Sequence, residues 1–283
     1  MRYEFIAVAQ EDRLTLITIN RPEVLNALHP PAHHELAAAF DAFQADPNQW
    51  VAIVTGAGER AFCAGNDLKF RAAAGRQAMP ESGFGGLTSR FDLEKPVLAA
   101  VNGIALGGGF ELALACDLIV ADVRAQFALP EVRVGLAALA GGLHRLPREV
   151  GLKTAMGIVL TGRRVDAAEG RRLGFVNEVA PEGTSLDIAR RWAAEILQAG
   201  PLAVRATKQV IMRGLDEPGL NEALGRQKDY PAVVAMYASG DALEGPRAFS
   251  EKRPPRWQRE LSGAVAGRDL PHDHAPQLKE NPQ

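Results

Sequence analysis

The chain has 283 residues, of which 47% are hydrophobic and 23% are charged, and 32 basic residues against 34 acidic ones give a net charge of −2. A chain of this length can bury a full core without disulfide or metal staples. The nearly balanced charge argues against a protein that binds nucleic acid through a basic face.

Cysteine content and hydropathy predict where the protein works. Cys63 and Cys116 are the two cysteines, too few for a disulfide scaffold, so we expect a reducing, cytoplasmic compartment. The first residues do not resemble a signal peptide. The most apolar stretch, residues 97–121, is interrupted by polar residues and glycines, so we predict no membrane-spanning helix and no membrane partner.

Short strands alternate with turns and helices in the first part of the chain. Apolar patterns predict strands at 14–19, 51–54, 97–101 and 118–120, and helices at 32–45 and 110–116. This rhythm indicates an α/β core. Residues 71–86 have no steady period and predict a mobile loop or a loosely held helix, which we expect to close over a substrate.

The pattern becomes helical from Lys153 onward. Helix-like spacing appears at 187–197, 201–213, 219–239 and 241–252. We therefore divide the chain into an α/β core (1–185), a helical C-terminal region (186–260) and a loose tail (261–283). The sequence shows no internal repeat.

One glutamate interrupts a helix that is apolar on nearly every side. Glu111 lies within residues 110–115, and a helix of this composition is buried. Burial of a lone charge costs several kcal/mol unless the charge is paired or its pKa shifts. Glu111 therefore either caps its helix, meets a buried arginine, or is a general acid/base tuned by burial.

A second glutamate has similar surroundings. Glu131 lies in the otherwise apolar segment 127–132, and an ion pair with Arg133 or Arg124 is the simplest explanation of this residue alone. Two carboxylates in neighbouring apolar segments are more suggestive together than either is alone. The sequence does not show whether they face each other.

Three glycines precede the apolar helix. Residues 107–109 leave backbone N–H groups open at the positive end of the helix dipole, where a donor can stabilise a developing oxyanion. The alternative is that the glycines serve only close packing of a turn.

The other motifs in the sequence give little information about function. Residues 56–61 match a loose dinucleotide pattern with no fitting context. His29, His33 and His34 are interpreted as surface or helix-start residues, and we predict no metal site. The sequence contains no serine elbow and no phosphate loop.

Four segments are informative together: residues 20–28, AFCAGNDLK at 61–69, residues 95–113 with ALGGGFELA, and FALPE at 127–131. Their order and spacing resemble the enoyl-CoA hydratase/isomerase (crotonase) family, over residues 5–258. The resemblance implies an α/β spiral of ββα turns with a helical C-terminal trimerisation region. It also implies a homotrimer or hexamer that acts on acyl-CoA thioesters.

The resemblance also assigns catalytic roles. It implies that the backbone N–H groups of Asn66 and Gly108 form the oxyanion hole that stabilises an enolate. Glu131 would exchange the proton at the α-carbon, and Glu111 would position and deprotonate the water. No metal or redox cofactor is expected, since coenzyme A is part of the substrate.

Coenzyme A contacts follow from the same resemblance. It places Ala64 and Lys69 at the coenzyme A site, with Lys69 near the phosphates. Phe249 and Lys252 resemble C-terminal residues that reach the nucleotide end, in the site of a neighbouring subunit. Without the resemblance, the same residues are explained as solvated charges and packing.

A narrower resemblance concerns the acyl group. Residues 84–88, 109–115 and 244–257 resemble the carnitinyl-CoA dehydratase branch, whose substrate carries a trimethylammonium group. Such a cation favours aromatic faces or a carboxylate. The aromatic candidates are Phe70, Phe84, Phe91 and Phe110.

The segment 135–142 departs from the family pattern. Ala138 stands where proline is common, and Leu139 where some isomerases have a carboxylate. We therefore expect a less rigid and more apolar loop at the acyl end. Phe84, Phe110 and Leu139 are the predicted acyl-pocket residues.

The leading hypothesis is hydration of a 2-enoyl-CoA to a 3-hydroxyacyl-CoA, reversible as dehydration. The alternatives are a crotonase-fold isomerase or thioester hydrolase, and carnitinyl-CoA dehydratase specifically. A binding or assembly protein that keeps the fold ranks below them, and a Rossmann oxidoreductase ranks last.

Overall fold

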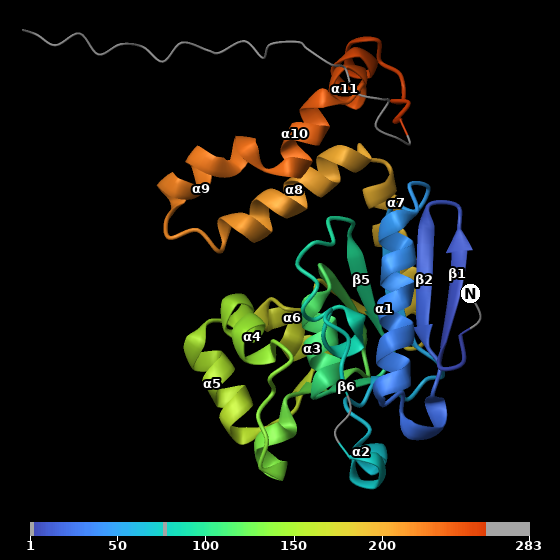
Figure 1. The fold of residues 1–283 in the computed structure, drawn as a ribbon, viewed down its shortest axis with the longest axis vertical. Helices are drawn as coiled ribbons and strands as arrows, with labels where there is room; N and C mark the ends of the chain where they lie inside the picture. Colours follow the sequence, from blue (N-terminus) through green and yellow to red (C-terminus); the bar gives the residue numbers. More distant parts are fainter. Residues whose placement is uncertain (1–2, 76–77, 259–283) are drawn as a thin grey trace, which may run out of the picture.

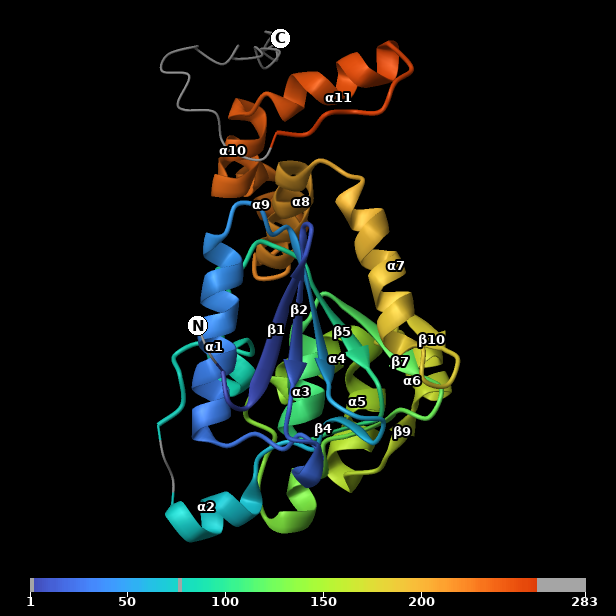
Figure 2. The ribbon, with the colours of Figure 1, turned by 90° about the vertical axis from the view of Figure 1, so that its right-hand side faces the viewer.

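The computed structural model describes residues 3–75 and 78–258 and contains two β-sheets surrounded by helices (Figures 1 and 2). The larger, six-stranded sheet has the order β1-β2-β3-β5-β7-β10. Its strands are β1 (Ile6–Glu11), β2 (Leu14–Ile19), β3 (Val51–Gly56), β5 (Val97–Val101), β7 (Leu118–Asp122) and β10 (Glu178–Ala180). Only β1 runs antiparallel to its neighbour in this sheet.

The chain alternates between the two sheets. The second sheet consists of β4 (Ala61–Cys63), β6 (Ile104–Leu106), β8 (Gln126–Ala128) and β9 (Val165–Asp166). Strands β3, β5 and β7 are each followed by a strand of this second sheet. Helices α2 (Leu68–Ala74) and α3 (Gly108–Ala115) follow the first two pairs, and the 3-10 helix η3 (Pro130–Val134) follows the third. The predicted spiral of ββα turns is confirmed.

The central strands are apolar throughout because helices cover both faces of the large sheet. In β3, Ala52 and Val54 pack in the cluster that contains α1 (Pro30–Ala45) and α3. The alternate residues Val51 and Ile53 pack instead against α7 (Ser185–Leu197). By these contacts α7 lies with the α/β layers.

The predicted helix at 32–45 corresponds to α1. Pro30 is its first residue, where the fixed φ of proline suits a helix start. Leu36, Phe40 and Phe43 are buried, as the periodicity predicts. The buried Lys95 ammonium donates to the carbonyls of Phe43 and Asp46, which satisfies the end of the helix.

The remaining helices form two groups. One consists of α4 (Gly142–Val150), α5 (Leu152–Thr161) and α6 (Ala167–Leu173). The other consists of α8 (Pro201–Gly214), α9 (Leu220–Arg226), α10 (Pro231–Ala238) and α11 (Asp241–Ser250), and gathers at the opposite end from α2 (Figure 1). Short 3-10 helices are η1 (Pro22–Val24), η2 (Phe84–Gly86) and η4 (Gln227–Asp229).

The prediction of one continuous helix over 219–239 is wrong. Tyr230 has an extended backbone and Pro231 begins α10, so the segment divides at this point. Proline disfavours helical geometry in the residue before it. The predicted loose tail, 261–283, lies outside the described residues. Within the described ranges, no helix is both long enough and apolar enough to cross a membrane.

Candidate active site

The glycine turn places the start of α3 against the β4 loop. Gly107 has φ +54, a conformation that favours glycine, and its carbonyl accepts hydrogen bonds from the N–H groups of Phe110 and Glu111. A Cβ on Gly109 would collide with the carbonyl oxygen of Cys63. Close packing therefore explains Gly109, while Gly108 remains at the first helical position with its N–H ahead of the intrahelical bonds.

The two predicted oxyanion donors lie side by side. Asn66 pairs with Leu28 in an isolated parallel bridge, made by the Leu28 N–H to Gly65 and the Asp67 N–H to Leu28. In a parallel bridge of this kind, the Asn66 N–H points away from Leu28. The position of a Cβ on Gly65 is 3.3 Å from the Gly108 nitrogen. The structure thus brings the Asn66 and Gly108 backbones together.

An ion pair supports this loop. Arg21 contacts Asp67 at 3.1 Å and also donates to the carbonyl of Ala27. The Asp67 carboxylate accepts a hydrogen bond from the Phe70 N–H at the start of α2. Both residues lie within the motifs noted in the sequence, yet their pairing across 46 positions could not be read from it.

Glu111 is buried, with 3% of its surface exposed. Its Oε1 accepts a hydrogen bond of 2.9 Å from the Gly142 N–H at the start of α4. Burial raises the pKa of Glu111 to about 7; the Gly142 N–H opposes this shift, and the charge of Glu131 adds to it. The carboxylate therefore neither caps its own helix nor forms an ion pair with an arginine of the described chain.

Glu131 approaches the same turn from η3. Its Oε1 lies 2.7 Å from the position that a Cβ on Gly107 would occupy, so the glycine makes room for the carboxylate. Its Oε2 is buried and has no hydrogen-bond partner among the described residues. Burial raises the pKa of Glu131.

The ion pair that offered the simplest explanation for Glu131 is not formed. Arg133 donates to the carbonyl of Thr161. Arg124 pairs with Asp122 and Glu182. Glu131 is therefore a half-buried residue with one buried, unsatisfied carboxylate oxygen, which is a costly arrangement for a purely structural residue.

The two glutamates and the two backbone donors converge on the first turn of α3. Glu111 lies on this helix, Glu131 reaches Gly107 just before it, and Gly65, next to Asn66 in the chain, lies close to the Gly108 backbone. The charge of Glu131 is close enough to raise the pKa of Glu111. Such a pair can hold a single proton near neutral pH beside donors suited to an oxyanion.

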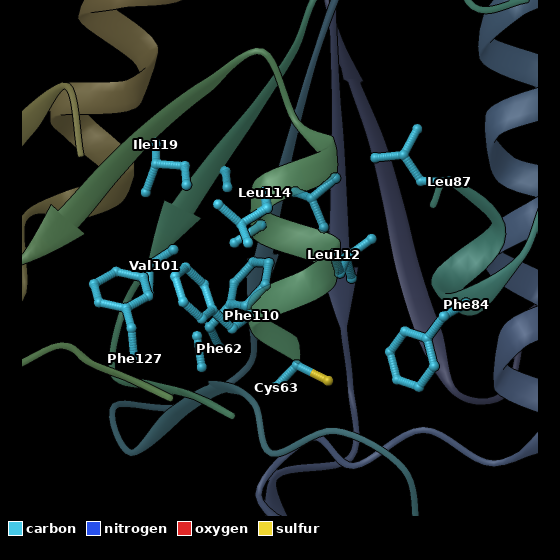
Figure 3. Packing of buried hydrophobic residues seen from close by; sticks show 14 of the residues in the cluster. Phe62, Cys63, Phe84, Leu87, Val101, Phe110, Leu112, Leu114, Ile119 and Phe127 are labelled. Atoms are coloured by element: carbon cyan, nitrogen blue, oxygen red, sulfur yellow. The ribbon is translucent and has the colours of Figure 1, made fainter. Parts of the chain in front are cut away.

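The predicted acyl-pocket residues have different surroundings. Phe84 is buried, and its ring fills the space where a Cβ on Gly108 would lie. Phe110 packs instead in the core, 5.1 Å from the rings of Phe127 and Phe175. Figure 3 shows Phe84 and Phe110 on different sides of α3. Leu139, in the loop before α4, is 83% exposed.

Of the two alternatives for His29 and His33, the helix-start position is confirmed and the surface position is wrong: His29 is the N-cap of α1, and His33 lies in its first turn. Both are buried, and His33 Nδ1 accepts a hydrogen bond of 3.0 Å from the Gly85 N–H. Burial lowers the pKa of His33 to about 3, so the ring is neutral. His33 thus supports the η2 turn that carries Phe84.

The predicted coenzyme A residues divide between the two ends of the molecule. Ala64 donates its N–H to Leu25, and Lys69 is exposed on α2. Phe249 is 88% exposed on α11, and Lys252 is exposed just after it. Figure 1 shows α2 and α11 at opposite ends, so one chain does not bring these pairs together. The described residues contain no group of side chains that could hold a metal ion.

A family model confirms the class of protein that this fold and site define. The enoyl-CoA hydratase/isomerase model matches residues 9–260, and the chain belongs to this family. Solved structures agree. Enoyl-CoA hydratase from Mycobacterium tuberculosis superposes with a TM-score of 0.85 at 43% identity, covering 90% of this chain and 99% of that one.

The curated relatives narrow the likeness to one branch. Carnitinyl-CoA dehydratase of Proteus mirabilis is 45% identical over 252 residues, covering 86% of this chain and 94% of that protein. The enzyme of the same name from Salmonella arizonae is 44% identical over 264 residues, covering 90% and 98%. Carnitinyl-CoA hydratase from Mycobacterium avium superposes with a TM-score of 0.73 at 39% identity, covering 92% and 100%. The predicted likeness to the carnitinyl-CoA dehydratase branch is confirmed.

Proposed function

We propose that this protein adds water to a 2-enoyl-CoA thioester to give a 3-hydroxyacyl-CoA, and catalyses the reverse dehydration. The observation that carries the proposal is the pair of glutamates, buried Glu111 and half-buried Glu131, at the glycine turn that begins α3. Membership of the enoyl-CoA hydratase/isomerase family supports the assignment.

The backbone donors have the role of stabilising charge. The thioester oxygen would accept hydrogen bonds from the N–H groups of Asn66 and Gly108. Addition of water at the β-carbon turns this oxygen into an enolate oxygen. Fixed donors at a helix start stabilise such a charge without reorganisation, and the loss of one donor costs about 10²–10³ in rate in comparable sites.

The glutamates move the protons. In hydration, Glu111 takes a proton from the water while the water oxygen bonds to the β-carbon. Glu131 gives its own proton to the α-carbon. The reverse reaction runs with the roles exchanged. Each direction needs one proton on the pair, and burial raises both pKa values, which favours this singly protonated form near neutral pH.

Addition of water changes no net oxidation state, so the proposed reaction requires no redox cofactor, and coenzyme A enters as part of the substrate. Ala64 and Lys69 would contact it from one subunit. Phe249 and Lys252 lie at the far end of the same chain, which favours a contribution from a neighbouring subunit of a homotrimer or hexamer. We propose a cytoplasmic location from the cysteine content.

Crotonobetainyl-CoA is the second candidate substrate, because relatives at 44–45% identity are carnitinyl-CoA dehydratases. Its trimethylammonium group would need an aromatic face or a carboxylate. Phe70 and Phe84 make edge contacts with His29 and His33, and Phe110 is fully buried. Of the predicted aromatic candidates, Phe91 is the most open, at 83% exposure.

The test follows the absorbance of the conjugated enoyl thioester with crotonyl-CoA, longer enoyl-CoAs and crotonobetainyl-CoA. Glu111→Gln and Glu131→Gln should each abolish most of the loss of this band. Glu195→Gln, an exposed glutamate on α7, is the matched control and should behave as wild type. Product analysis separates the alternatives: a shifted double bond would indicate an isomerase, and free coenzyme A a hydrolase. Full activity of both glutamine variants would contradict the proposal.

A further inference from the structure

Arg145 lies in the first turn of α4, close to the hydrogen bond that Glu111 accepts from the Gly142 N–H. Its Nη2 donates a hydrogen bond of 2.9 Å to the carbonyl of Thr88. Its Nη1 lies against Gly141, where a Cβ would collide with the guanidinium. The side chain therefore joins the turn before α4 to the segment that follows η2.

The Gly141–Gly142 turn is important because it holds the Glu111 carboxylate. The Gly142 N–H is the donor to Glu111 Oε1, and a Cβ on Gly142 would lie 2.9 Å from Glu111 Cγ. Gly141 has φ +102, and its carbonyl accepts the N–H of Arg145. Arg145 thus contacts this turn through both its backbone and its guanidinium.

The positive charge of Arg145 lies near one aromatic ring: its guanidinium carbon is 5.9 Å from the centre of the Phe91 ring. Among the described residues, no carboxylate lies within ion-pair distance of its guanidinium, although its side chain is only partly exposed. Its charge opposes the rise in the pKa of Glu111 that burial causes. The guanidinium therefore carries a partly buried charge that no carboxylate at ion-pair distance neutralises, near enough to Glu111 to act on its titration.

We propose that Arg145 is a positioning residue for Glu111: it ties the Gly141–Gly142 turn to Thr88 and so fixes the donor that orients the carboxylate. The catalytic part of this inference rests on the proposed function. The same contact reaches the acyl side, because the Thr88 N–H donates to the carbonyl of Phe84. One guanidinium therefore couples the Glu111 carboxylate to the turn that carries Phe84.

The charged groups that face Glu111 are few. Glu131 on η3 and Arg145 on α4 act on it directly. The other titratable residues of α4, His144, Arg148 and Glu149, are exposed. Burial raises the pKa of the Cys63 and Cys116 thiols, which stay neutral. Strand β6 and the 3-10 helix η2 contribute no titratable side chain. A change in the titration of Glu111 can therefore be traced to Arg145.

The experiment compares Arg145→Gln and Arg145→Lys with Arg148→Gln. Arg148 is an exposed arginine on the same helix, and its guanidinium donates to the carbonyl of His144. Two quantities are measured: the pH profile of kcat and KM for crotonyl-CoA hydration, and the infrared titration of the protonated Glu111 carboxyl. This infrared band is assigned by its absence in Glu111→Gln. Circular dichroism establishes that each variant is folded.

We expect Arg145→Gln to move the Glu111 titration to higher pH by about one unit, because a nearby cation is lost. Its kcat should fall about tenfold with a smaller change in KM, because the misplaced carboxylate affects the reacting geometry. Arg145→Lys keeps the charge but lacks the forked donor, so its titration should stay near wild type while kcat still falls. Arg148→Gln should match wild type in both.

An unchanged Glu111 titration and unchanged kcat in folded Arg145→Gln would overturn the inference. If Arg145→Gln does not fold, Arg145→Lys decides: unchanged kcat would overturn the positioning role. A shifted titration in Arg145→Gln, with no hydration by the wild type, would support the placement of Arg145 and contradict the proposed function instead.

Discussion

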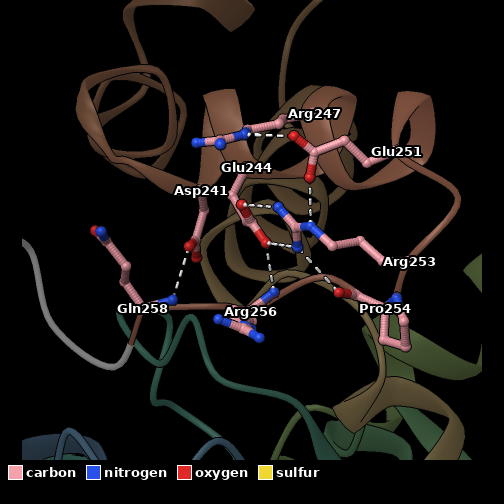
Figure 4. Close-up of polar contacts among 8 residues, drawn as sticks. All are labelled: Asp241, Glu244, Arg247, Glu251, Arg253, Pro254, Arg256 and Gln258. Atoms are coloured by element: carbon pink, nitrogen blue, oxygen red, sulfur yellow. Dashed lines mark hydrogen bonds and ion pairs between the residues drawn. The ribbon is translucent and has the colours of Figure 1, made fainter.

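Glutamates at two ends of the molecule have opposite surroundings. Glu111, at the start of α3, is buried, and Glu131, on η3 beside it, is half-buried; neither has an arginine partner at ion-pair distance within the described chain. At the far end, Arg253 binds Glu244 through two nitrogens at 2.6 and 3.0 Å and contacts Glu251 at 2.6 Å (Figure 4).

The titration of these groups follows their surroundings. Burial raises the pKa of Glu111 to about 7. Hydrogen bonds from Arg253, and then from the Arg256 N–H, lower the pKa of Glu244 to about 2. The same side chain can thus hold a proton near neutral pH in one region and stays ionised in the other. The contrast shows that burial and pairing with arginine set the pKa of a glutamate, and residue type does not.

The largest expected effect comes from replacing the two glutamates proposed to transfer protons. Glu111→Gln and Glu131→Gln should each lower kcat for hydration by about 10²–10⁴, the contribution of a general acid or base. Glu251→Gln, in the arginine-paired region, should leave kcat near wild type. Stopped-flow absorbance with crotonyl-CoA measures kcat for all three variants. An equal loss of kcat in the Glu251 variant would contradict the distinction between the two regions.

The next effect concerns the donor beside these glutamates. A Cβ in Gly108→Ala collides with the Phe84 ring and displaces the predicted oxyanion donor, so kcat should fall about 10²–10³. Gly157→Ala in α5, where a Cβ meets no atom within 4 Å, is the matched control. Wild-type kcat in folded Gly108→Ala, from the same steady-state assay, would argue against the oxyanion hole at this position.

A smaller effect appears in stability against pH. Glu111 keeps its proton up to about pH 7 in the folded state and loses it near 4.5 when unfolded. Wild-type stability should therefore fall between pH 4.5 and 7 relative to Glu111→Gln. The relative loss is at most about 3 kcal/mol above pH 7. Urea unfolding at several pH values measures it, and a constant difference across this range would contradict the raised pKa.

The paired region should show the opposite and smallest response. The pKa of Glu244 is lowered, so its stabilisation is present above pH 4.5 and is lost as pH falls toward 2. Glu244→Gln should lower the melting temperature slightly at low salt, and less at high salt, because screening weakens a partly exposed ion pair. Calorimetry at two salt concentrations measures this, and a salt-independent loss would indicate that packing dominates.

Strands long enough to show an apolar pattern could be predicted from the sequence. Strands that exist only through hydrogen bonds to a neighbouring strand could not. The predicted bounds 14–19 and 97–101 are those of β2 and β5. Strands β4, β6 and β8 have three residues each, too few to show a period. The ββα repeat is also invisible to a periodic search, because β3, β5 and β7 begin at unequal intervals, at Val51, Val97 and Leu118.

The candidate acid/base residues of the site could be predicted from the sequence, but the residues that hold them in place could not. Glu111 and Glu131 are conspicuous as carboxylates in apolar segments. Their convergence depends on Gly142 and Gly107, which contact them from other parts of the chain. His33 and Arg145 gave no signal, since a histidine or arginine on a helix is as often exposed as buried, and tertiary contacts decide which.

The most direct test of the central claim is the fate of crotonyl-CoA in D₂O enriched in ¹⁸O. If Glu111 and Glu131 add water as proposed, mass spectrometry and NMR should detect 3-hydroxybutyryl-CoA with one deuterium on the α-carbon and one ¹⁸O on the β-carbon. Neither label should appear with the Glu111→Gln, Glu131→Gln double variant. A product with a shifted double bond, free coenzyme A, or the same labels from the double variant would contradict the account.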